Sequence, residues 1–313
     1  MKNYIITGGA GFIGSHLADK LLPLADKIYI IDNLVRTNSL RNINHLIGNQ
    51  KIEFVSTDIS KLKLEIFYMS EIIDSVFHLA ATRINRCVKY PREGHEFIAD
   101  GGYNVIEFCA NKKIKLFFAS SASVYASPKR LPIKETDLCQ PYTIYGAGKY
   151  YTENLLQSFD IMSGLDYTIN RFFSVYGVRM DNQGVYTEVI FNWLNSIKNG
   201  NRELTVFGDP DEKIIDLVYV SDVVNAIYTT MNSSNKEIYN VSTETGTTLS
   251  NLIKVISKVT KTDIKIKMFP ETRKDVEKAR IGDTTKLKNL GWSPEVSLEE
   301  GIEKTWKWIK EGI

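Results

Sequence analysis

Hydrophobic and polar positions alternate along the first half of this chain in a repeating pattern of short and long segments. Short apolar segments with the length of buried strands lie at residues 4–6, 27–31, 52–55, 75–79 and 115–119. Helical periodicity is found at 15–22, near Arg92–Asn111 and near Tyr145–Met162. Strands that alternate with helices form a parallel sheet with right-handed crossovers. We therefore predict an α/β, Rossmann-type doubly wound parallel sheet.

The pattern changes from about residue 175. A helix is predicted near Val185–Lys198, short strands near Leu204–Val206 and Asp216–Val220, and helices at the end of the chain. These elements indicate a smaller, mixed α/β lobe built from several excursions. We expect residues 1–174 to form the sheet domain, with roughly 210–240 returning to it, and 175–313 to form mainly the second lobe.

A glycine-rich turn joins the first predicted strand to the first helix. Its sequence, TGGAGFIG at residues 7–14, spaces the glycines as G-x-x-G-x-x-G. Gly8 allows a tight turn, Gly11 lets the backbone approach a pyrophosphate, and Gly14 lets the helix lie close to the strand. The free N–H groups and positive end of the helix, which includes Phe12 and Ile13, then face the phosphates. The turn predicts a dinucleotide-binding site.

The second predicted strand ends in an acidic residue, Asp32, which Asn33 follows. A carboxylate about 20 residues beyond the glycine turn is placed to accept hydrogen bonds from an adenosine ribose. It would also repel a 2′-phosphate, which favours NAD over NADP, although the nearby Arg36 could soften that preference. We predict NAD as the cofactor, with Asp32 and Asn33 in its site.

Composition and charge exclude several other classes of protein. The formal net charge is +2 with acids and bases interspersed, which gives no electrostatic case for a nucleic acid or a membrane surface. No apolar run approaches the ~20 residues of a membrane span, and the glycine turn occupies the place of a signal peptide's apolar region. The three cysteines are odd in number and lack metal-like spacing, which indicates reduced thiols in a cytoplasm. The four histidines are scattered, so we predict no metal site.

Tyr145 and Lys149 are four residues apart and share one face if a helix begins here. A free phenol has a pKa of ~10 and is a poor base at neutral pH. A neighbouring Lys⁺, together with a positive nicotinamide ring, would stabilise the phenolate and lower that pKa. The spacing alone is common, but after a dinucleotide turn it predicts a catalytic pair.

At this point the chain resembles the extended short-chain dehydrogenase/reductase family, in particular its nucleotide-sugar epimerases and dehydratases. The resemblance covers nearly the whole length. Besides the glycine turn, Asp32, Tyr145 and Lys149, it rests on Asp58-Ile59, His78-Leu79-Ala80-Ala81, Ser120–Tyr125, Pro141, Arg171–Gly177, Val206–Asp209, Asp216–Val223 and Leu290–Pro294.

The resemblance implies roles for residues at matching positions. Tyr145 would take a proton from a sugar hydroxyl while the hydride of that carbon passes to NAD. Lys149 would hold the nicotinamide ribose and tune Tyr145, and Ser121 would hydrogen-bond the same hydroxyl. The resemblance also gives the cofactor site Asp58, Ile59, Leu79, Ala80, Ala81 and Phe172, and the substrate site Arg83, Ser121, Ser123, Ser174, Val206 and Arg273.

Two positions narrow the reaction that the resemblance implies. The family's 4,6-dehydratases carry an Asp-Glu pair just after the catalytic hydroxyl residue, and its decarboxylases keep the Glu. This chain has Ala122 and Ser123 there, which cannot do carboxylate acid–base work. Oxidation at a ring carbon, usually C4, remains, followed by return of the hydride to the other face or by its transfer elsewhere.

Other departures concern the substrate diphosphate. Ser174 stands where the family often has Asn, and Ile215 stands where many relatives have a diphosphate-binding arginine. Arg273 matches the family's other diphosphate arginine, while Arg83 and Arg86 would add charge, read the sugar, or lie on the surface. A UDP-, GDP-, CDP- or dTDP-sugar therefore stays open.

The first hypothesis is an NAD-dependent nucleotide-sugar 4-epimerase that serves surface polysaccharide precursors in the cytoplasm. The alternatives are a net C4 dehydrogenase or reductase, and a catalytically silent NAD-binding scaffold. The resemblance also implies a homodimer through a four-helix bundle, made by the helices near Arg92–Asn111 and Tyr145–Met162. The apolar residues of these helices would equally suit an ordinary core: Phe97, Val105, Phe108, Leu155, Leu156 and Phe159.

Overall fold

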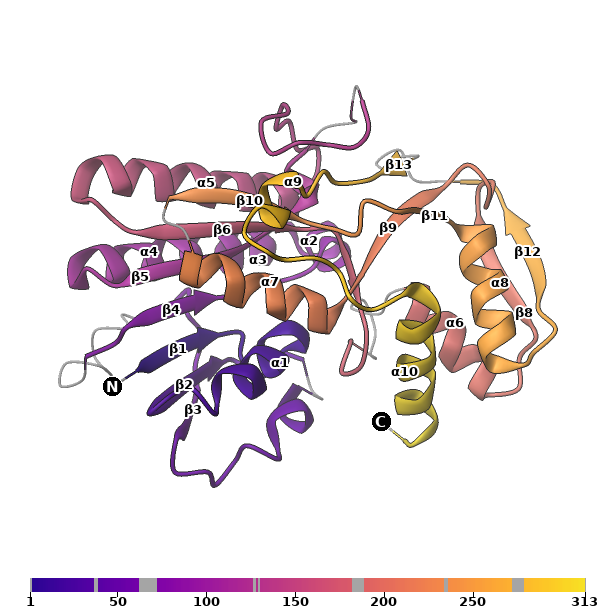
Figure 1. Cartoon of the computed structure of the whole chain (residues 1–313), viewed down its shortest axis with the longest axis horizontal. Helices are drawn as coiled ribbons and strands as arrows, with labels where there is room; N and C mark the ends of the chain where they lie inside the picture. The colour runs from indigo at the N-terminus through magenta and orange to yellow at the C-terminus, as the bar shows by residue number, and fades with distance from the viewer. Residues whose placement is uncertain are drawn as a thin grey trace. The chain divides into compact units, whose positions relative to one another are not determined.

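The chain forms two compact units, which are described in turn (Figure 1). The computed structural model describes residues 2–36, 39–61, 72–125, 128, 130–181, 189–233, 236–271 and 279–312. The first unit comprises Met1–Ala126, Leu138–Arg171 and Val224–Tyr239. The second comprises Ser127–Asp137, Phe172–Val223 and Asn240–Ile313.

A seven-stranded sheet carries the first unit, in the order β3-β2-β1-β4-β5-β6-β10. The register is parallel throughout β3-β2-β1-β4-β5, and the order changes direction between β1 and β4, which is where doubly wound sheets bind ligands. The prediction of a Rossmann-type sheet is thus confirmed. The strands are β1 (Asn3–Thr7), β2 (Lys27–Asp32), β3 (Ile52–Ser56), β4 (Ser75–His78), β5 (Lys115–Ser121), β6 (Tyr167–Phe172) and β10 (Glu237–Val241).

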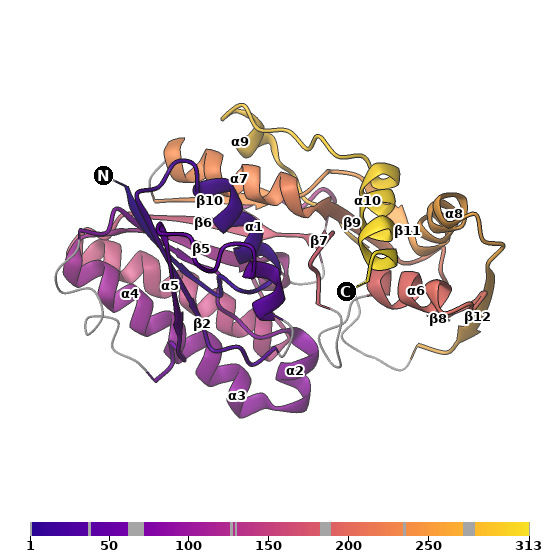
Figure 2. The same cartoon turned by 90° about the horizontal axis from the view of Figure 1, so that it is seen from below.

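Helices cover both faces of this sheet. Figure 2 shows α4 (Gly101–Lys112) and α5 (Ile144–Ser163) on one face and α7 (Val220–Ser233) on the other. On the second face Lys20 of α1 (Phe12–Leu21) lies over Tyr228 of α7, with 5.5 Å from its ammonium to the ring centroid. A buried core beneath α4 and α5 joins them to the strands, and it includes Ile5, Val105, Phe108, Leu116, Phe118, Leu156 and Ile169.

The helix predicted near 92–111 is interrupted. It begins as α3 (Pro91–His95), widens to a π-helical turn at Glu96–Asp100 and continues as α4. The paired glycines at the start of α4, Gly101 and Gly102, have low helix propensity, and single π turns are the usual form of such a widening. The short helix α2 (Ile84–Lys89) precedes α3, and 3₁₀ turns lie at Ser39–Ile43 and Ala122–Val124.

The second unit is a mixed α/β structure. Its main sheet has the order β11-β9-β13, with β7 also paired to β9, and a separate ribbon pairs β12 with β8. The strands are β7 (Ser174–Tyr176), β8 (Glu203–Phe207), β9 (Ile214–Tyr219), β11 (Gly246–Thr248), β12 (Lys265–Phe269) and β13 (Ala279–Arg280). The helices are α6 (Val189–Lys198), α8 (Leu249–Thr260), α9 (Thr285–Lys288) and α10 (Leu298–Lys310).

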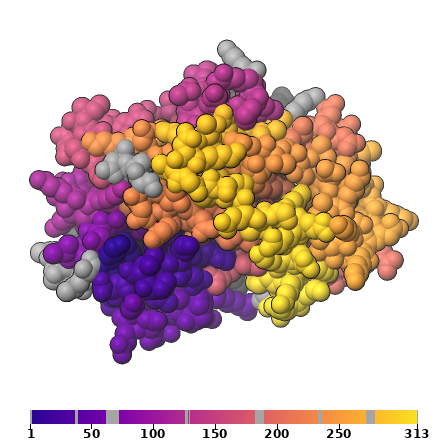
Figure 3. Space-filling view, viewed as in Figure 1, coloured from indigo at the N-terminus to yellow at the C-terminus, as the bar shows by residue number. Residues whose placement is uncertain are grey.

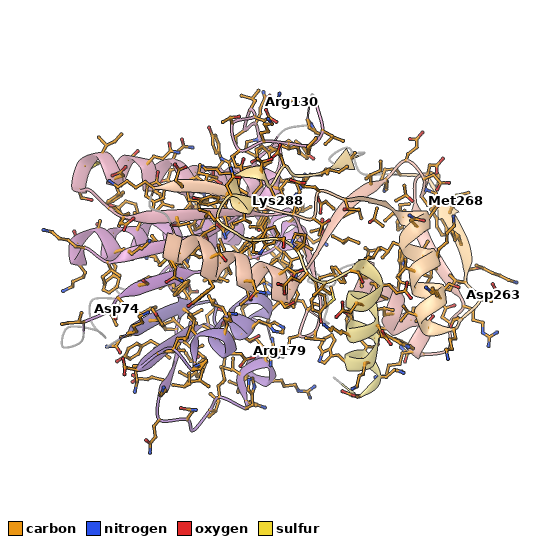
Figure 4. All side chains as sticks on the ribbon, in the orientation of Figure 1. Asp74, Arg130, Arg179, Asp263, Met268 and Lys288 are labelled. Carbon is orange, nitrogen blue, oxygen red and sulfur yellow. The ribbon has the colours of Figure 1, made fainter. Side chains whose placement is uncertain are left out.

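Several predicted elements of this unit are present with altered limits. The helix predicted near 185–198 is described from Val189, and 185–188 lie outside the described residues. The strand predicted at 216–220 runs from Ile214 to Tyr219. Figure 4 labels Arg130 in this unit, whose guanidinium donates a 2.8 Å hydrogen bond to Asp137, and Met268 on β12, which is 65% exposed.

The beginning of the chain contributes to the surface of the first unit. In Figure 3 the indigo residues of the β1–α1–β2 segment form one continuous surface on the face shown. Within the described part of the chain, no helix combines the length and apolarity needed to cross a bilayer. In the same residues, no group of three or more His, Cys, Asp or Glu side chains is arranged to hold a metal ion.

Candidate active site at the carboxyl edge of the first sheet

The glycine turn after β1 is shaped for the close approach of another molecule to its backbone. Gly8 has φ +69°, and its N–H donates a 2.7 Å hydrogen bond to the carbonyl of Ile31. A Cβ on Gly14 would lie 2.2 Å from the Gly8 carbonyl oxygen, so only glycine lets α1 begin against the turn. The N-cap residue, Gly11, supplies no side-chain acceptor, and the first turn of α1 carries no acidic residue. The uncapped N–H groups therefore suit an anion such as a pyrophosphate.

Asp32 lies at the end of β2, beside this turn. Its carboxylate accepts a 3.2 Å hydrogen bond from the N–H of Ala10 and a 2.9 Å bond from that of Leu34. The next residue, Asn33, accepts a 3.2 Å bond from the N–H of Val35. These bonds hold the Asp32 carboxylate beside the glycine turn, which is the place expected of a residue that binds an adenosine ribose.

The neighbouring strand ends bring further predicted residues to the same edge. Leu79 donates from its N–H to the Thr7 carbonyl at 3.0 Å. A Cβ on Gly8 would lie 2.7 Å from Ala80, so β4 and the glycine turn are in direct contact, and Ala81 follows. Asp58, after β3, binds its own turn through the N–H and hydroxyl of Ser60.

Ile59, the residue after Asp58, contributes its side chain to the core of the first unit. Its side chain is only 4% exposed and packs in the core against Gly101 of α4. Its carbonyl accepts a 2.8 Å hydrogen bond from Asn104 Nδ2. The Ile59 side chain therefore helps to fix the loop after Asp58, and the place of this residue in the cofactor site stays a prediction.

The end of β5 presents the hydroxyl of Ser121. This hydroxyl donates to Ser123 Oγ at 3.2 Å and accepts from the Ser123 N–H at 3.1 Å, which caps the 3₁₀ turn Ala122–Val124. The start of α5 lies against the same turn, because a Cβ on Gly146 would be 2.2 Å from the Ser123 carbonyl oxygen. This contact places Tyr145 beside Ser121.

Tyr145 is half-buried in the first turn of α5, where the Thr143 hydroxyl accepts a 3.0 Å hydrogen bond from the Gly146 N–H. Burial raises the pKa of Tyr145, while a hydrogen bond with Ser121 and the charges of Arg83 and Arg36 act to lower it. The lowering predicted from Lys149 and a positive nicotinamide ring concerns the protein with NAD bound, and it stays a prediction. The positive groups that act on the phenol come from the loops after β2 and β4.

Lys149 is buried one turn further along α5, with 2% of its surface exposed. Its ammonium donates a 2.7 Å hydrogen bond to the Ala119 carbonyl and lies 4.7 Å from the Phe118 ring centroid and 5.9 Å from that of Tyr145. Burial lowers the pKa of Lys149 to about 7, although the charge of Glu153 acts to raise it. Burial and the charge of Glu153 thus act in opposite directions on the Lys149 proton.

Comparison with known proteins decides the family. A family model described as GDP-mannose 4,6 dehydratase matches residues 5–305. UDP-glucose 4-epimerase from Thermotoga maritima, solved with UDP-glucose, is 33% identical and has a TM-score of 0.91 over 99% of both chains. The chain belongs to the nucleotide-sugar epimerase and dehydratase group of the extended short-chain dehydrogenases/reductases. The family resemblance predicted from the motifs is confirmed.

Two further relatives mark the range of this group. UDP-glucuronic acid decarboxylase 1 of Danio rerio is 30% identical over 320 residues, which are 100% of this chain and 73% of that protein. UDP-glucose 4-epimerase of Thermus thermophilus, solved with NAD, is 27% identical, with a TM-score of 0.87 over 99% of this chain and 100% of that one. The group is NAD-dependent, and the glycine turn, the uncapped start of α1 and Asp32 fit that cofactor.

Three described residues that the family resemblance assigns to ligands lie in the second unit. Phe172 is buried, and Ser174 is exposed at the start of β7. Val206 is 2% exposed in β8, where it alternates with the exposed Phe207, so its side chain is a core residue of this unit. Arg273 lies outside the described residues.

The two arginines of the loop after β4 have different surroundings. Arg83 precedes α2, and its charge acts on Tyr145. Arg86 binds Glu93 of α3 through Nε at 3.0 Å, and its guanidinium lies over the Tyr90 ring at 5.1 Å. Arg86 thus helps to join α2 to α3.

Sequence reasoning missed a buried ion pair behind the site. Arg171 on β6 donates to Glu153 from Nε at 3.0 Å and from Nη2 at 2.6 Å, and from Nη1 to the Tyr125 hydroxyl at 2.9 Å. Arg171 and Glu153 are 3% and 1% exposed. The sequence did contain a sign that Glu153 lies near the site, because Tyr145, Lys149 and Glu153 follow one another at intervals of four residues and so share one face of α5.

Proposed function

We propose that this protein is an NAD-dependent nucleotide-sugar 4-epimerase. The proposal rests above all on the placement of Tyr145 beside Ser121, because the turn that follows Ser121 lies against Gly146; this brings together the two hydroxyl groups needed for proton transfer at the edge that carries the glycine turn. When bound, NAD accepts the hydride of the C4 carbon and returns it to the opposite face. The known epimerases among the relatives, which act on UDP-glucose, support the same reaction.

The protein's own groups divide the acid–base work. Ser121 holds the C4 hydroxyl of the sugar by a hydrogen bond, and the Tyr145 phenolate accepts its proton. Lys149 stabilises that phenolate as a cation and binds the ribose next to the nicotinamide. On the return step Tyr145 donates the same proton to the C4 oxygen, so no net proton or electron is consumed.

The turn after β5 argues against the family's other reactions. A 4,6-dehydration or a decarboxylation assisted by a carboxylate needs an acidic side chain at this turn. Ala122 is buried with 1% exposed, and the Ser123 oxygen is hydrogen-bonded to Ser121. The two positions leave oxidation and reduction at C4 as the chemistry.

We infer that the first unit binds NAD and that the second binds mainly the nucleotide sugar. Asp32 favours NAD over NADP because its carboxylate would repel a 2′-phosphate. We assign the diphosphate to Arg273 and Ser174, with Arg83 near the sugar. A UDP-sugar is the leading substrate, since UDP-glucose occupies the solved Thermotoga maritima relative.

Three broader proposals accompany this function. The three cysteines are thiols in a protein that we place in the cytoplasm, where it makes precursors of surface polysaccharides.

We also propose a homodimer through a four-helix bundle of α4 and α5. Val105, Phe108 and Leu156 belong to the core, but Tyr103 and Tyr151 are 39% and 47% exposed and offer a face for a second copy. Tyr151→Glu should give a monomer in sedimentation, and an unchanged profile would rule out this bundle.

The test of the function is an assay with a panel of UDP-, GDP-, CDP- and dTDP-sugars. Product NMR and absorbance at the reduced-nicotinamide band are recorded together on the purified protein. A C4 epimer with no lasting absorbance change is the expected result. A stoichiometric absorbance rise with a keto-sugar would instead establish a net C4 dehydrogenase, and no product with any sugar would support a silent NAD-binding scaffold.

A further inference from the structure

The carboxylate of Glu153 lies one helical turn beyond Lys149, and it is almost completely buried. Its bidentate bond with Arg171 compensates the charge, but a buried ion pair of this kind is weak support for stability, because its desolvation offsets the attraction. The remaining contacts of Glu153 lead toward the catalytic edge. Besides Arg171, its Oε1 accepts a hydrogen bond from the hydroxyl of Ser120, at the end of β5.

Two successive residues of β5 are thereby tied to α5. Ala119 accepts a 2.7 Å hydrogen bond from Lys149 Nζ, and Ser120 donates to Glu153. The next residue of the strand is Ser121, whose hydroxyl meets Tyr145. A shift of Glu153 would therefore move the strand end that carries Ser121 relative to the helix that carries Tyr145.

The charge of Glu153 is its second link to the catalytic edge, because it acts on Lys149. The titratable groups that face Lys149 are Tyr145 and Glu153 on α5, His78 on β4 and Cys87 on α2. Burial lowers the pKa of His78 to about 3, so it is neutral, and burial raises the pKa of Cys87 to about 11, so it is also neutral. Of these groups, Glu153 has the largest charge effect that opposes the loss of the Lys149 proton. It lies at the i+4 position from Lys149, where side chains on a helix are neighbours.

We propose that Glu153 is a positioning residue for the reaction: it keeps Lys149 a cation and, through Ser120, holds Ser121 against Tyr145. Tyr145 and Lys149 then act as a coupled pair that has lost one proton, and the Glu153 charge favours the state with phenolate and ammonium over the state with phenol and amine. This role rests on the proposed function, in which that phenolate is the base.

Three substitutions separate the charge from the tether. Glu153→Gln keeps an oxygen for Ser120 and removes the charge. Glu153→Asp keeps the charge and shortens the reach, and Ser120→Ala removes the tether alone. If Glu153→Gln fails to fold because Arg171 loses its counter-ion, the double variant Glu153→Gln/Arg171→Gln removes both charges and takes its place.

The first measurement is the pH dependence of kcat. We expect Glu153→Gln to move the high-pH limb about one unit toward lower pH, because Lys149 loses its proton more readily. Glu153→Asp should restore the limb with a lower kcat, and Ser120→Ala should lower kcat about tenfold without moving the limb. A Glu153→Gln profile that coincides with that of the unsubstituted protein would overturn the proposal.

The second measurement does not depend on activity. The ultraviolet absorbance of the Tyr145 phenolate is obtained as the difference between each protein and its Tyr145→Phe counterpart, across the same pH range. Glu153→Gln should show less phenolate on the plateau below the high-pH limb, where the pair has lost one proton, while Ser120→Ala should match the unsubstituted protein. An equal phenolate fraction in Glu153→Gln would refute the charge effect, even if no sugar in the panel reacts and the proposed function itself fails.

Discussion

Glu153 in the first unit and Asp216 in the second are both buried carboxylates, 1% exposed, but they have opposite kinds of partner. Glu153 is bound by a guanidinium and has an ammonium one helical turn away. Asp216 accepts from neutral donors, namely the N–H and hydroxyl of Thr243, each at 2.7 Å, and the N–H of Gly282 at 3.3 Å.

The difference separates a group that acts through charge from a group that holds the chain. Neutral donors fix the geometry of a carboxylate without compensating its charge, and burial accordingly raises the pKa of Asp216. The donors of Asp216 come from segments beyond β10 and β13, so its bonds tie both to β9. We infer that Asp216 clamps the second unit, whereas the cationic neighbours of Glu153 connect it to chemistry.

The largest expected effect tests the chemical side of this comparison. Tyr145→Phe removes the acid–base group and leaves a ring of nearly the same shape. We expect turnover to fall by about 10²- to 10⁴-fold, the usual contribution of general acid–base catalysis. Thermal stability and the amount of bound NAD should stay near those of the unsubstituted protein, measured by calorimetry and by cofactor release. Near-normal turnover would exclude Tyr145 as the base.

Replacing Asp216 should have the opposite outcome from Tyr145→Phe, with a large loss of stability and a small loss of turnover. Asp216→Ala leaves the Thr243 and Gly282 donors unsatisfied in a buried place, and each buried donor without a partner costs about 1–3 kcal/mol. We expect a loss of about 2–4 kcal/mol in the free energy of unfolding, measured by urea titration. Turnover per folded molecule should change far less than in Tyr145→Phe. A loss of turnover with unchanged stability would assign Asp216 to the site instead.

The same contrast explains how far the sequence could predict the structure. Strands β1, β2, β4 and β5 were predictable because each contains a short uninterrupted apolar run, and β3 because its three apolar residues are interrupted only by Glu53. β6 is buried along its whole length but contains Thr168, Asn170 and Arg171, so no apolar run marks it. One of the polar residues that interrupt the apolar pattern of β6 is Arg171, the partner of Glu153.

The candidate site divides in a similar way. The glycine turn and the Tyr145–Lys149 spacing are local patterns, and a short sequence window contains all of the information. Glu153 depends on Ser120 and Arg171, which lie 33 and 18 residues away in the chain, and only folding brings them together. Ile59 and Val206 were predicted from motif positions alone, and burial of their side chains is a property of the packed units.

The smallest effect at neutral pH concerns His78, a buried polar group of the first unit with a neutral partner. Its Nδ1 lies 2.7 Å from Thr7 Oγ1, and its ring stacks on Phe118 with 5.6 Å between centroids. Burial lowers the pKa of His78 to about 3 in the folded protein, whereas an unfolded chain has the ordinary value of about 6.5. Between these values the unfolded state binds the additional proton, so stability is lost as pH falls.

We therefore expect His78 to contribute nothing to the pH dependence above about pH 7, and up to about 1.4 kcal/mol of lost stability per pH unit below about pH 6. Urea unfolding at a series of pH values, compared between the unsubstituted protein and His78→Asn, isolates this slope from the other titrating groups. His78→Asn should be less stable at pH 7 but should lose stability more slowly on acidification. Equal slopes would mean that His78 takes up its proton in the folded state. In that case a second positive charge would lie beside Lys149, and Glu153 would have to compensate both.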